Sequence, residues 1–217
     1  MINVNLKKRF ITSISLFILL FLMFIDNLIL GYILILIGVF SFLEFTNISK
    51  IIFIKKKSIQ FFINLIFLVY IFTFCSFFLV SSYYVHLKFL IFTVLITCIS
   101  SDIGGYVFGK IFKGPKLTKI SPNKTVSGSA GSFIFSLILI SLIFYLVTNK
   151  FDFSILILGF MTSFGCQLGD LFFSFLKRKS YLKDTGNILP GHGGILDRID
   201  GIILGVPVGF ATLILLN

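Results

Sequence analysis

Long unbroken apolar runs follow one another along most of this sequence and limit it to few folds. A transmembrane helix needs about 20 apolar residues, with a range of roughly 17–25. Candidate spans lie at residues 10–25, 28–45, 59–80, 87–108, 128–148, 153–176 and 199–216. Only 12% of the residues are charged, about half the share found in soluble domains. We therefore predict an all-α integral membrane protein with about seven transmembrane helices, and we exclude a soluble helical bundle.

The apolar runs also suggest how the chain is organised. We expect one polytopic membrane domain over residues 1–217. Within it, residues 1–58 should form an N-terminal helical hairpin, whose two runs are separated only by the turn-forming pair Asp26-Asn27. The hairpin could be a shallow one, but we favour one that crosses fully, because both of its ends then carry basic residues on the same side. Residues 59–217 should form the catalytic helical bundle. No small-residue cleavage site follows the first run, so a signal peptide is not expected.

The positions of Lys and Arg predict an orientation. Seventeen of the 19 basic residues lie in the N-terminal tail and in the second, fourth and sixth connections, and only Lys88 and Lys150 lie in the others. By the positive-inside rule, the N-terminus and the long polar connections are then cytoplasmic. We expect a multi-pass protein of the inner (cytoplasmic) membrane with its active site on the cytoplasmic side. Topology also explains the net charge of +11 without a nucleic-acid partner.

Half of the acidic residues lie in one segment, residues 169–201. They are Asp170, Asp184, Asp197 and Asp200. Asp170 lies inside the sixth span, where a charge costs roughly 2.5–3.5 kcal/mol on insertion scales and indicates a functional site by default. Helical spacing places Asp170, Ser174 and Lys177 on one face. A plain ion pair with Lys177 or with a neighbouring helix is the alternative explanation.

Asp197 and Asp200 flank Arg198 at the start of the seventh span, three residues apart and so on one helix face. The helix dipole favours an acid at this end, so capping explains one of the two. Capping does not explain why Asp170 and Asp184 occur in the same segment. Several carboxylates at a membrane surface suit Mg²⁺, which keeps its waters and is completed by substrate phosphates.

A glycine-rich loop, Pro190-Gly191-His192-Gly193-Gly194, lies between these acids. Glycines let the backbone approach a ligand and present N–H groups to phosphate, although a flexible turn would explain the glycine pair alone. His192 could donate to a phosphate or act as a general acid or base, and without a second His or Cys it makes a poor zinc site. The nearby Lys and Arg residues could neutralise phosphates, but the positive-inside signal also explains basic residues here.

A second polar segment follows the fourth span. Asp102 is again an acid within an apolar run. Ser121, Lys124 and Thr125 then precede Gly128 and the next apolar run. Ser-Pro and Thr at this place could be only a helix N-cap signal, whereas together with Lys124 they could bind an anion at the helix start. The spacing matches neither a Walker A loop nor a dinucleotide fingerprint.

These residues closely resemble the signature of the phosphatidate cytidylyltransferases, also called CDP-diacylglycerol synthases. The matching positions are Ser174, Lys177, Arg178, Lys183, Asp184, Pro190, His192, Gly193, Gly194, Asp197, Arg198 and Asp200. The segment Ser121-Pro122-x-Lys124-Thr125 and the region of Asp102 resemble the upstream motif of the same family.

The resemblance implies a nucleotidyltransferase that transfers the cytidylyl group of CTP to phosphatidate, giving CDP-diacylglycerol and pyrophosphate in phospholipid biosynthesis. It also implies a Mg²⁺-dependent homodimer in membrane lipid, with Asp170 and Asp197 as metal ligands and a second cation left open. The implied catalytic residues are Asp170, Asp197, Lys183, Asp184, His192 and Asp200. The implied substrate-binding residues are Ser121, Lys124, Thr125, Ser174, Lys177, Arg178, Gly193, Gly194, Arg198 and Asp102.

Five positions depart from the family pattern: Ile103, Asn123, Val126, Ser127 and Phe173. The chain is also short for the family near its N-terminus. These departures leave a changed substrate preference, reduced activity or an inactive homologue open. Two other functions also stay open. A CTP-dependent polyprenol or lipid kinase has a similar upstream motif but releases CDP, and a small transporter would use Asp102 and Asp170 as an ion path.

Overall fold

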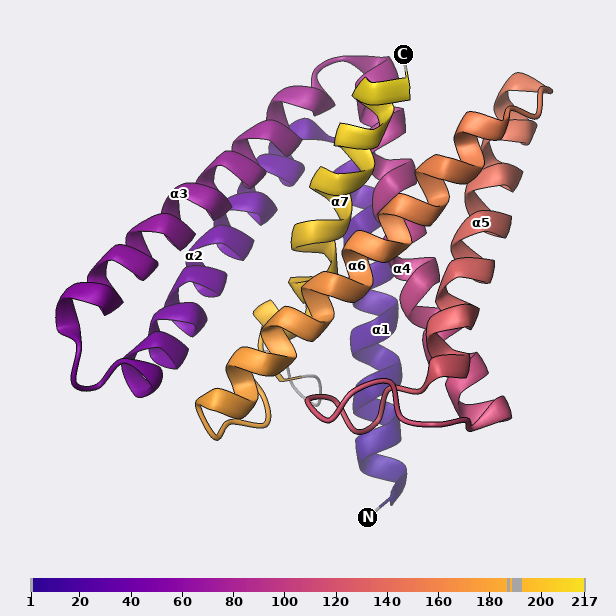
Figure 1. Cartoon of the computed structure of the whole chain (residues 1–217). Coiled ribbons are helices and arrows are strands. Elements are labelled where there is room, and N and C mark those ends of the chain that lie inside the picture. The colour runs from indigo at the N-terminus through magenta and orange to yellow at the C-terminus, as the bar shows by residue number, and fades with distance from the viewer. Residues whose placement is uncertain (1, 187, 189–192, 217) are drawn as a thin grey trace. The chain divides into compact units, whose positions relative to one another are not determined.

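The computed structural model describes the backbone of residues 2–186, 188 and 193–216, and the side chains of these residues from residue 14 onward. The described residues form helices joined by turns and contain no strand, and Lys116 and Thr125 form an isolated bridge. The helices are α1 (Ile2–Ile25), α2 (Asn27–Ile52), α3 (Lys57–Ser82), α4 (Val85–Phe112), α5 (Val126–Thr148), α6 (Phe153–Lys179) and α7 (Leu196–Leu216), as Figure 1 shows. The prediction of an all-α chain is confirmed for the described residues, which form seven helices; that all seven cross the membrane stays a prediction.

Six of the helices, α2 to α7, are long and apolar enough to cross a membrane. The shorter apolar stretch Ile14–Ile25 belongs to α1. The chain is therefore a multi-pass membrane protein. The side of the membrane on which the termini and the connections lie stays a prediction.

The chain folds as two compact units. Unit 1 comprises Met1–Lys88 and Leu176–Arg198, and unit 2 comprises Phe89–Phe175 and Ile199–Asn217. The end of α6 and the first residues of α7 thus belong to unit 1, whereas the longer parts of both helices belong to unit 2. The expected single domain, with a hairpin over residues 1–58 and a bundle over residues 59–217, stays a prediction.

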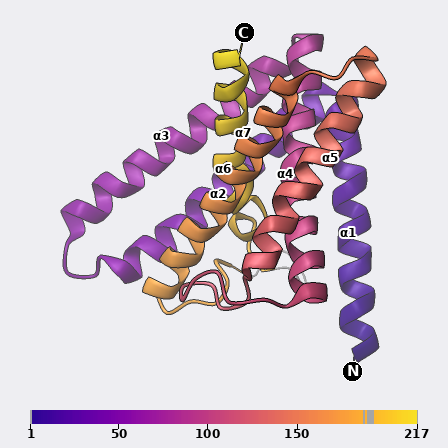
Figure 2. The same cartoon turned by 45° about the vertical axis from the view of Figure 1, so that its right-hand side comes forward.

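In unit 1, α2 and α3 pack side by side as an antiparallel pair (Figures 1 and 2). The rings of Phe45 and Phe67 stack with centroids 3.9 Å apart. Near them, the Ser49 hydroxyl donates to the side-chain oxygen of Asn64 at 2.7 Å. At the opposite end of the pair, the Asn27 amide donates to the carbonyl of Ser82 at 3.3 Å. Polar bonds at both ends therefore fix the register of the two helices.

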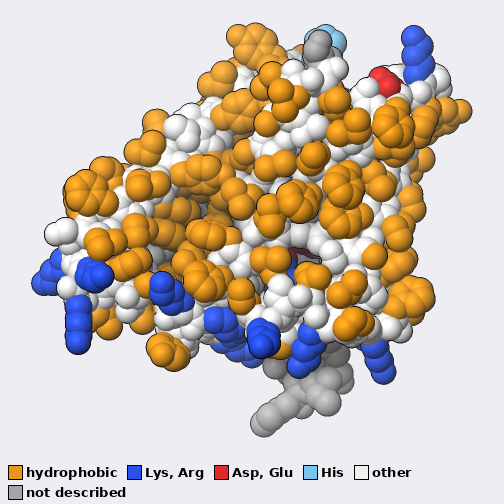
Figure 3. Space-filling model, viewed as in Figure 1, with side chains coloured by type: hydrophobic (Ala, Val, Ile, Leu, Met, Phe, Trp, Pro, Cys, Tyr) orange, Lys and Arg blue, Asp and Glu red, His pale blue; other side chains and the backbone are white. Residues whose placement is uncertain are grey.

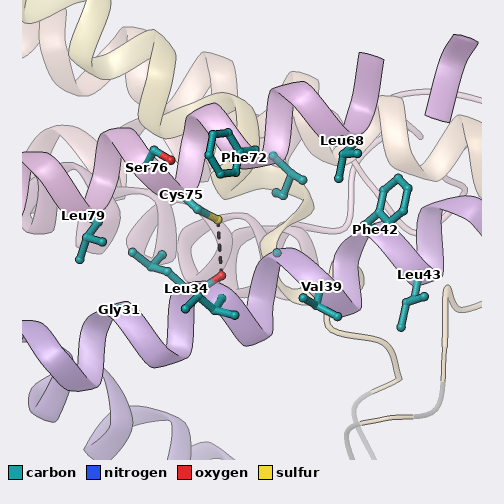
Figure 4. A pocket seen from close by; sticks show the side chains of 13 residues that line it. Gly31, Leu34, Val39, Phe42, Leu43, Leu68, Phe72, Cys75, Ser76 and Leu79 are labelled. Carbon is teal, nitrogen blue, oxygen red and sulfur yellow. Dashed lines mark hydrogen bonds between the residues drawn. The ribbon is translucent and has the colours of Figure 1, made fainter. Parts of the chain in front are cut away.

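Between these ends the two helices enclose an apolar groove of about 480 Å³ (Figure 4). The Cys75 thiol of α3 donates across it to the carbonyl of Leu34 on α2, at 3.5 Å. Gly31 and Gly38 of α2 line the groove, and a Cβ at either position would meet only ordinary van der Waals contact. The absence of a side chain at these two glycines leaves space between the helices, and this space forms part of the groove.

In unit 2, glycines let the backbones of α4 and α5 approach closely, as small residues do at membrane helix interfaces. A Cβ at Gly131 would lie 2.7 Å from the carbonyl oxygen of Gly104, and a Cβ at Gly104 would lie 2.6 Å from Cβ of Phe135. A hydrogen bond of 3.2 Å from the Ser100 hydroxyl to the carbonyl of Phe135 joins the same two helices. Close backbone contact and a polar bond together hold this pair.

The contact between α6 and α7 in unit 2 follows the same principle. A Cβ at Gly165 would lie 2.9 Å from Cβ of Val208, and a Cβ at Gly201 would lie 2.6 Å from the sulfur of Cys166. A side chain at either position would clash with the neighbouring helix, so glycine is needed at both for this close packing. The part of α7 from Gly201 onward is thereby held against the part of α6 that belongs to unit 2.

Side chains cap three of the helix starts. Asp26 accepts from the N–H of Leu28 at 2.7 Å at the start of α2, and Thr125 accepts from the N–H of Gly128 at 3.1 Å at the start of α5. Before α6, Asp152 accepts from the N–H of Ser154 at 3.1 Å and from its hydroxyl at 2.9 Å. These two bonds lower the pKa of the Asp152 carboxyl below its ordinary value. The N-cap explanation for Thr125 is thus confirmed.

The surface of each unit separates apolar from basic side chains (Figure 3). In unit 1, basic side chains gather where α2 connects to α3. The connection contains Lys55 and Lys56, and α3 begins at Lys57. Apolar side chains cover the visible faces of the two helices. In unit 2, four lysines lie in the connection between α4 and α5, and Lys110 lies in the last turn of α4. This separation is what a membrane-spanning unit requires.

The glycine contacts of unit 2 predict a difference between two Gly→Ala substitutions. Gly131→Ala places a methyl group against the α4 backbone, and overpacking of this kind costs about 1–3 kcal/mol. Gly31→Ala meets only Leu79, at 3.7 Å, and gains up to about 1 kcal/mol of helix propensity. Thermal unfolding in detergent, followed by circular dichroism, should show a lower midpoint for Gly131→Ala alone. Equal midpoints would contradict the close packing of α4 and α5.

Candidate active site

The signature residues described in unit 1 converge on the carboxylate of Asp197, in the first turn of α7. Its Oδ1 accepts from Nζ of Lys177 at 2.7 Å. Its Oδ2 accepts from the backbone N–H of Thr185 at 2.8 Å and from that of Gly194 at 3.1 Å. Only 6% of the Asp197 side chain is exposed. One buried carboxylate therefore joins the end of α6, the following connection and the start of α7.

The local backbone explains how these groups reach Asp197. After α6 the chain reverses, with Leu182 donating to the carbonyl of Lys177 at 2.9 Å and Tyr181 in the left-handed region at a φ of 57°. Gly193 has a φ of 81°, which favours glycine. A Cβ there would also lie 3.1 Å from Oδ2 of Asp197. Gly193 is therefore required for its conformation and for the close approach of the carboxylate.

A second acid of unit 1, Glu44 on α2, also binds this segment. Glu44 is not among the site residues predicted from the sequence. Its Oε2 accepts from the hydroxyl of Thr185 and from the N–H of Leu196, both at 2.8 Å. Its Oε1 accepts from the N–H of Ile195 at 3.0 Å. A signal was present, because Glu44 lies inside the second apolar run, just as Asp170 lies inside the sixth.

The other signature residues of unit 1 lie near this cluster or outside the described residues. The side chains of Lys183, Asp184, Arg178 and Arg198 are exposed. Gly193 lies close to Asp184, whose Cβ would be 3.5 Å from a Cβ at the glycine. The prediction for His192 falls outside the described residues, as does that for Pro190 and Gly191 in the same loop.

In unit 2, Asp170 forms an ion pair with Lys124, which donates to its Oδ2. Their side chains are 27% and 28% exposed. Lys124 belongs to the upstream motif, so the structure brings that motif to α6. The ion pair with another part of the chain agrees with the alternative explanation of Asp170 as a pairing residue, and it also places a cation beside a candidate metal ligand.

Two further candidate residues of unit 2 lie on helices next to Asp170. Asp200 is buried, and the chain passes close to α6 at this point because Gly169 carries no side chain. Asp102 on α4 is exposed and accepts from the thiol of Cys166 on α6 at 3.6 Å. Both acids therefore flank the helix that carries Asp170.

The remaining candidates are Ser121, Thr125 and Ser174. The carbonyl of Ser121 accepts from the N–H of Lys124 at 3.1 Å, which closes the turn before the lysine. Thr125 caps α5, and Ser174 is half-buried on α6. Ser121 and Thr125 thus have a structural part on either side of Lys124, and a substrate-binding part for them stays a prediction.

The five residues that depart from the family pattern differ in how deeply they are buried. Ile103, Asn123 and Val126 are exposed, so they leave the interior of unit 2 unchanged. Ser127 is half-buried and within 3.1 Å of the Thr125 hydroxyl, so it adjoins the cap of α5. Phe173 is 2% exposed. An apolar ring suits this buried place, whereas a charged side chain here would need a buried partner.

The donors present suit Mg²⁺, although the described residues contain no group of three or more His, Cys, Asp or Glu placed to hold a metal. Mg²⁺ usually needs only one or two carboxylates, together with waters and substrate phosphates. Asp170 and Asp197 each hold a lysine ammonium. Each carboxylate therefore already stabilises a cation, and each has lone pairs for further ligands.

Comparison with known proteins identifies the family. A model of the cytidylyltransferase family matches residues 10–216. The chain belongs to this family. The resemblance seen in the signature is thereby confirmed.

Curated relatives carry the name phosphatidate cytidylyltransferase. The protein of Bacillus subtilis (strain 168) is 45% identical over 131 residues, which cover 58% of this chain and 48% of the relative. The protein of Mycobacterium leprae (strain TN) is 39% identical over 127 residues, covering 58% and 41%. That of Rickettsia typhi (strain ATCC VR-144 / Wilmington) is 44% identical over 122 residues, covering 51% and 52%. The chain spans about half the length of the curated relatives it matches.

The two ion pairs differ in burial and should differ in strength. Removing one partner of a buried pair costs about 3–5 kcal/mol, and exposed pairs contribute about 0–1 kcal/mol. Lys177→Met should therefore lower the unfolding midpoint in detergent more than Lys124→Met does, because Asp197 is the less exposed acid. Lys119→Met, at an exposed position of the upstream connection, is the control and should change little. Equal losses at positions 177 and 124 would contradict the buried status of the Asp197 pair.

Proposed function

We propose that this chain transfers the cytidylyl group of CTP to phosphatidate, giving CDP-diacylglycerol and pyrophosphate in phospholipid biosynthesis. The observation that carries the proposal is the signature segment closed around the buried Asp197, in a chain that matches the cytidylyltransferase family over residues 10–216. The name shared by the curated relatives supports this choice of substrates.

The main requirement of the proposed cytidylyl transfer is neutralisation of negative charge. A phosphate oxygen of phosphatidate attacks the α-phosphorus of CTP, a new P–O bond forms, and the bond to the bridging oxygen breaks as pyrophosphate leaves. Both reactants are anionic and repel each other, so fixed cations and in-line alignment should provide most of the rate. Lys183, Arg178 and Arg198 expose basic groups around the Asp197 cluster, where they suit phosphate oxygens. We assign His192 to the same phosphate-binding set.

We further propose Mg²⁺ as the cofactor, with Asp170 and Asp197 as its protein ligands and a second cation left open. When bound, Mg²⁺ neutralises phosphate charge. This chain's own part is to hold each carboxylate in place. In unit 1 that work is done by Lys177 and by the N–H groups of Thr185 and Gly194. In unit 2 it is done by Lys124.

The supply of substrates favours an active site at the cytoplasmic side of the inner membrane, because CTP then comes from water and phosphatidate from the leaflet. We propose that the N-terminus and the basic connections are cytoplasmic, in keeping with the distribution of Lys and Arg. A basic membrane surface also attracts anionic lipid. We propose a homodimer as well, on the family resemblance alone.

A direct assay tests the reaction. Purified protein with radiolabelled CTP, phosphatidate and Mg²⁺ should form CDP-diacylglycerol and an equal amount of pyrophosphate. Asp170→Asn and Asp197→Asn should each lower turnover about 100-fold, since each removes a carboxylate charge from a proposed metal ligand. Asp26→Asn is the matched control, because Asn caps a helix as well as Asp does, and it should keep full turnover.

Each other outcome has a definite meaning. Near-normal turnover of both Asn variants at saturating Mg²⁺ would show that the metal assignment is wrong. Release of CDP in place of pyrophosphate would identify a CTP-dependent lipid kinase. Solute flux in proteoliposomes without nucleotide turnover would identify a transporter.

The proposed orientation can be measured by cysteine labelling. In a variant whose three cysteines are replaced, Lys150→Cys should react with a membrane-impermeant maleimide in intact cells. Lys55→Cys should react only after the cells are permeabilised, because its connection is proposed to be cytoplasmic. Both positions are exposed, so burial does not limit labelling. The reverse pattern would overturn the orientation.

A further inference from the structure

We infer that Glu44 is a positioning residue for the proposed reaction, one that fixes the backbone around Asp197 from another helix. The inference rests on the proposed function. It concerns a residue outside the signature segment, and it follows from how the two oxygens of Glu44 are bonded within unit 1.

Glu44 binds the signature segment on both sides of its glycine-rich loop. Before the loop, the Thr185 hydroxyl donates to Oε2 at 2.8 Å. After the loop, the N–H of Leu196 donates to Oε2 at 2.8 Å and that of Ile195 donates to Oε1 at 3.0 Å. Glu44 is 3% exposed. A buried acid thus closes the base of the loop by accepting three hydrogen bonds.

The same short stretch of backbone holds Asp197. Thr185 links the two acids, because its hydroxyl donates to Glu44 and its N–H donates to Oδ2 of Asp197. Gly194, which also donates to Oδ2 of Asp197, directly precedes Ile195, and Leu196 directly precedes Asp197. Any shift of the groups bonded to Glu44 would therefore move the donors of the proposed metal ligand.

Two glycines make room for the Glu44 carboxyl group. A Cβ at Gly194 would lie 2.5 Å from Oε2 of Glu44, and a Cβ at Gly186 would lie 2.9 Å from its carboxyl carbon. Real Cβ atoms do not approach other atoms so closely, so each position has to be glycine while Glu44 stays in place. The packing leaves the carboxyl group little freedom to choose other partners.

The helix start gives a physical reason for an acid at this place. The first N–H groups of a helix lack partners within it, and the dipole favours negative charge there. A neighbouring Ser or Asp would satisfy such groups locally. Glu44 instead reaches them from α2, about 150 positions earlier in the chain. Its bonds therefore tie α2 to Thr185, before the loop, as well as to the start of α7.

Substitution by glutamine tests this geometry with almost no change in volume. Ile195 and Leu196 donate to different oxygens of Glu44, so either orientation of a Gln amide turns an NH₂ group toward one backbone N–H. Loss of an outer-shell partner typically costs 10–100-fold in metal affinity. We expect Glu44→Gln to raise the Mg²⁺ concentration for half-maximal rate by about 10-fold or more. Hydrogen exchange at residues 194–197 should speed up in the protein without Mg²⁺.

Two further substitutions separate positioning from general stability. Thr185→Val removes the hydroxyl bond to Glu44 but keeps the N–H bond to Asp197, and it should shift both readouts in the same direction. Thr185→Ser restores the hydroxyl and should restore both. Ser49→Ala removes a hydrogen bond to α3 from the same helix as Glu44, so it controls for a weakened α2 and should leave both readouts within about twofold of the wild type.

The outcomes are separable. If the wild-type protein forms no CDP-diacylglycerol, the proposed function is wrong. The hydrogen-exchange measurement at residues 194–197 still tests the bonds of Glu44 in that case. An active wild type with unchanged exchange and Mg²⁺ dependence in Glu44→Gln overturns the inference. Faster exchange with an unchanged Mg²⁺ requirement would make Glu44 a structural tether only, which also overturns it. Should Glu44→Gln fail to fold, the pair of Thr185 variants decides the question.

Discussion

A buried carboxyl group has to find hydrogen-bond donors, and in unit 1 this requirement organises the signature segment. Asp197 and Glu44 are both almost fully buried, and burial without partners would cost each of them several kcal/mol. Six donated hydrogen bonds, three to each acid, meet this need. Five of the six come from residues of the connection or of the start of α7. The segment between α6 and α7 is thus shaped by two acids as much as by its own glycines.

Unit 2 solves a different problem, which is to bring polar side chains together between apolar helices. Without a hydrophobic force between helices in lipid, close packing and polar contacts provide the attraction. Glycines of α4 and α5, and of α6 and α7, let these backbones approach. The ion pair of Lys124 with Asp170 and the bond between the Ser101 and Ser163 hydroxyls, 2.8 Å long, then form among them. A carboxylate inside an apolar span is therefore matched by a cation from the upstream motif.

These two arrangements fit a reaction between two anionic substrates. An enzyme of this kind has little covalent chemistry to perform and needs charged groups held in fixed places. In each unit a lysine and a carboxylate are already paired. Such pairs keep the basic and acidic groups oriented, and the basic residues Arg178, Lys183 and Arg198 near Asp197 in the chain are exposed.

The apolar runs and the dense motif predict the helical class, the number of helices and the segment that contains the signature, because apolar length and a motif are local properties of a chain. Tertiary structure decided the partners. The signature predicts Asp197 but not that Thr185 and Gly194 hold it, and the apolar runs give no sign that Glu44 meets Ile195 and Leu196. Nor does helical spacing predict that Asp170 pairs with Lys124, 46 positions away. Contacts between distant residues depend on how the helices pack, which no local pattern records.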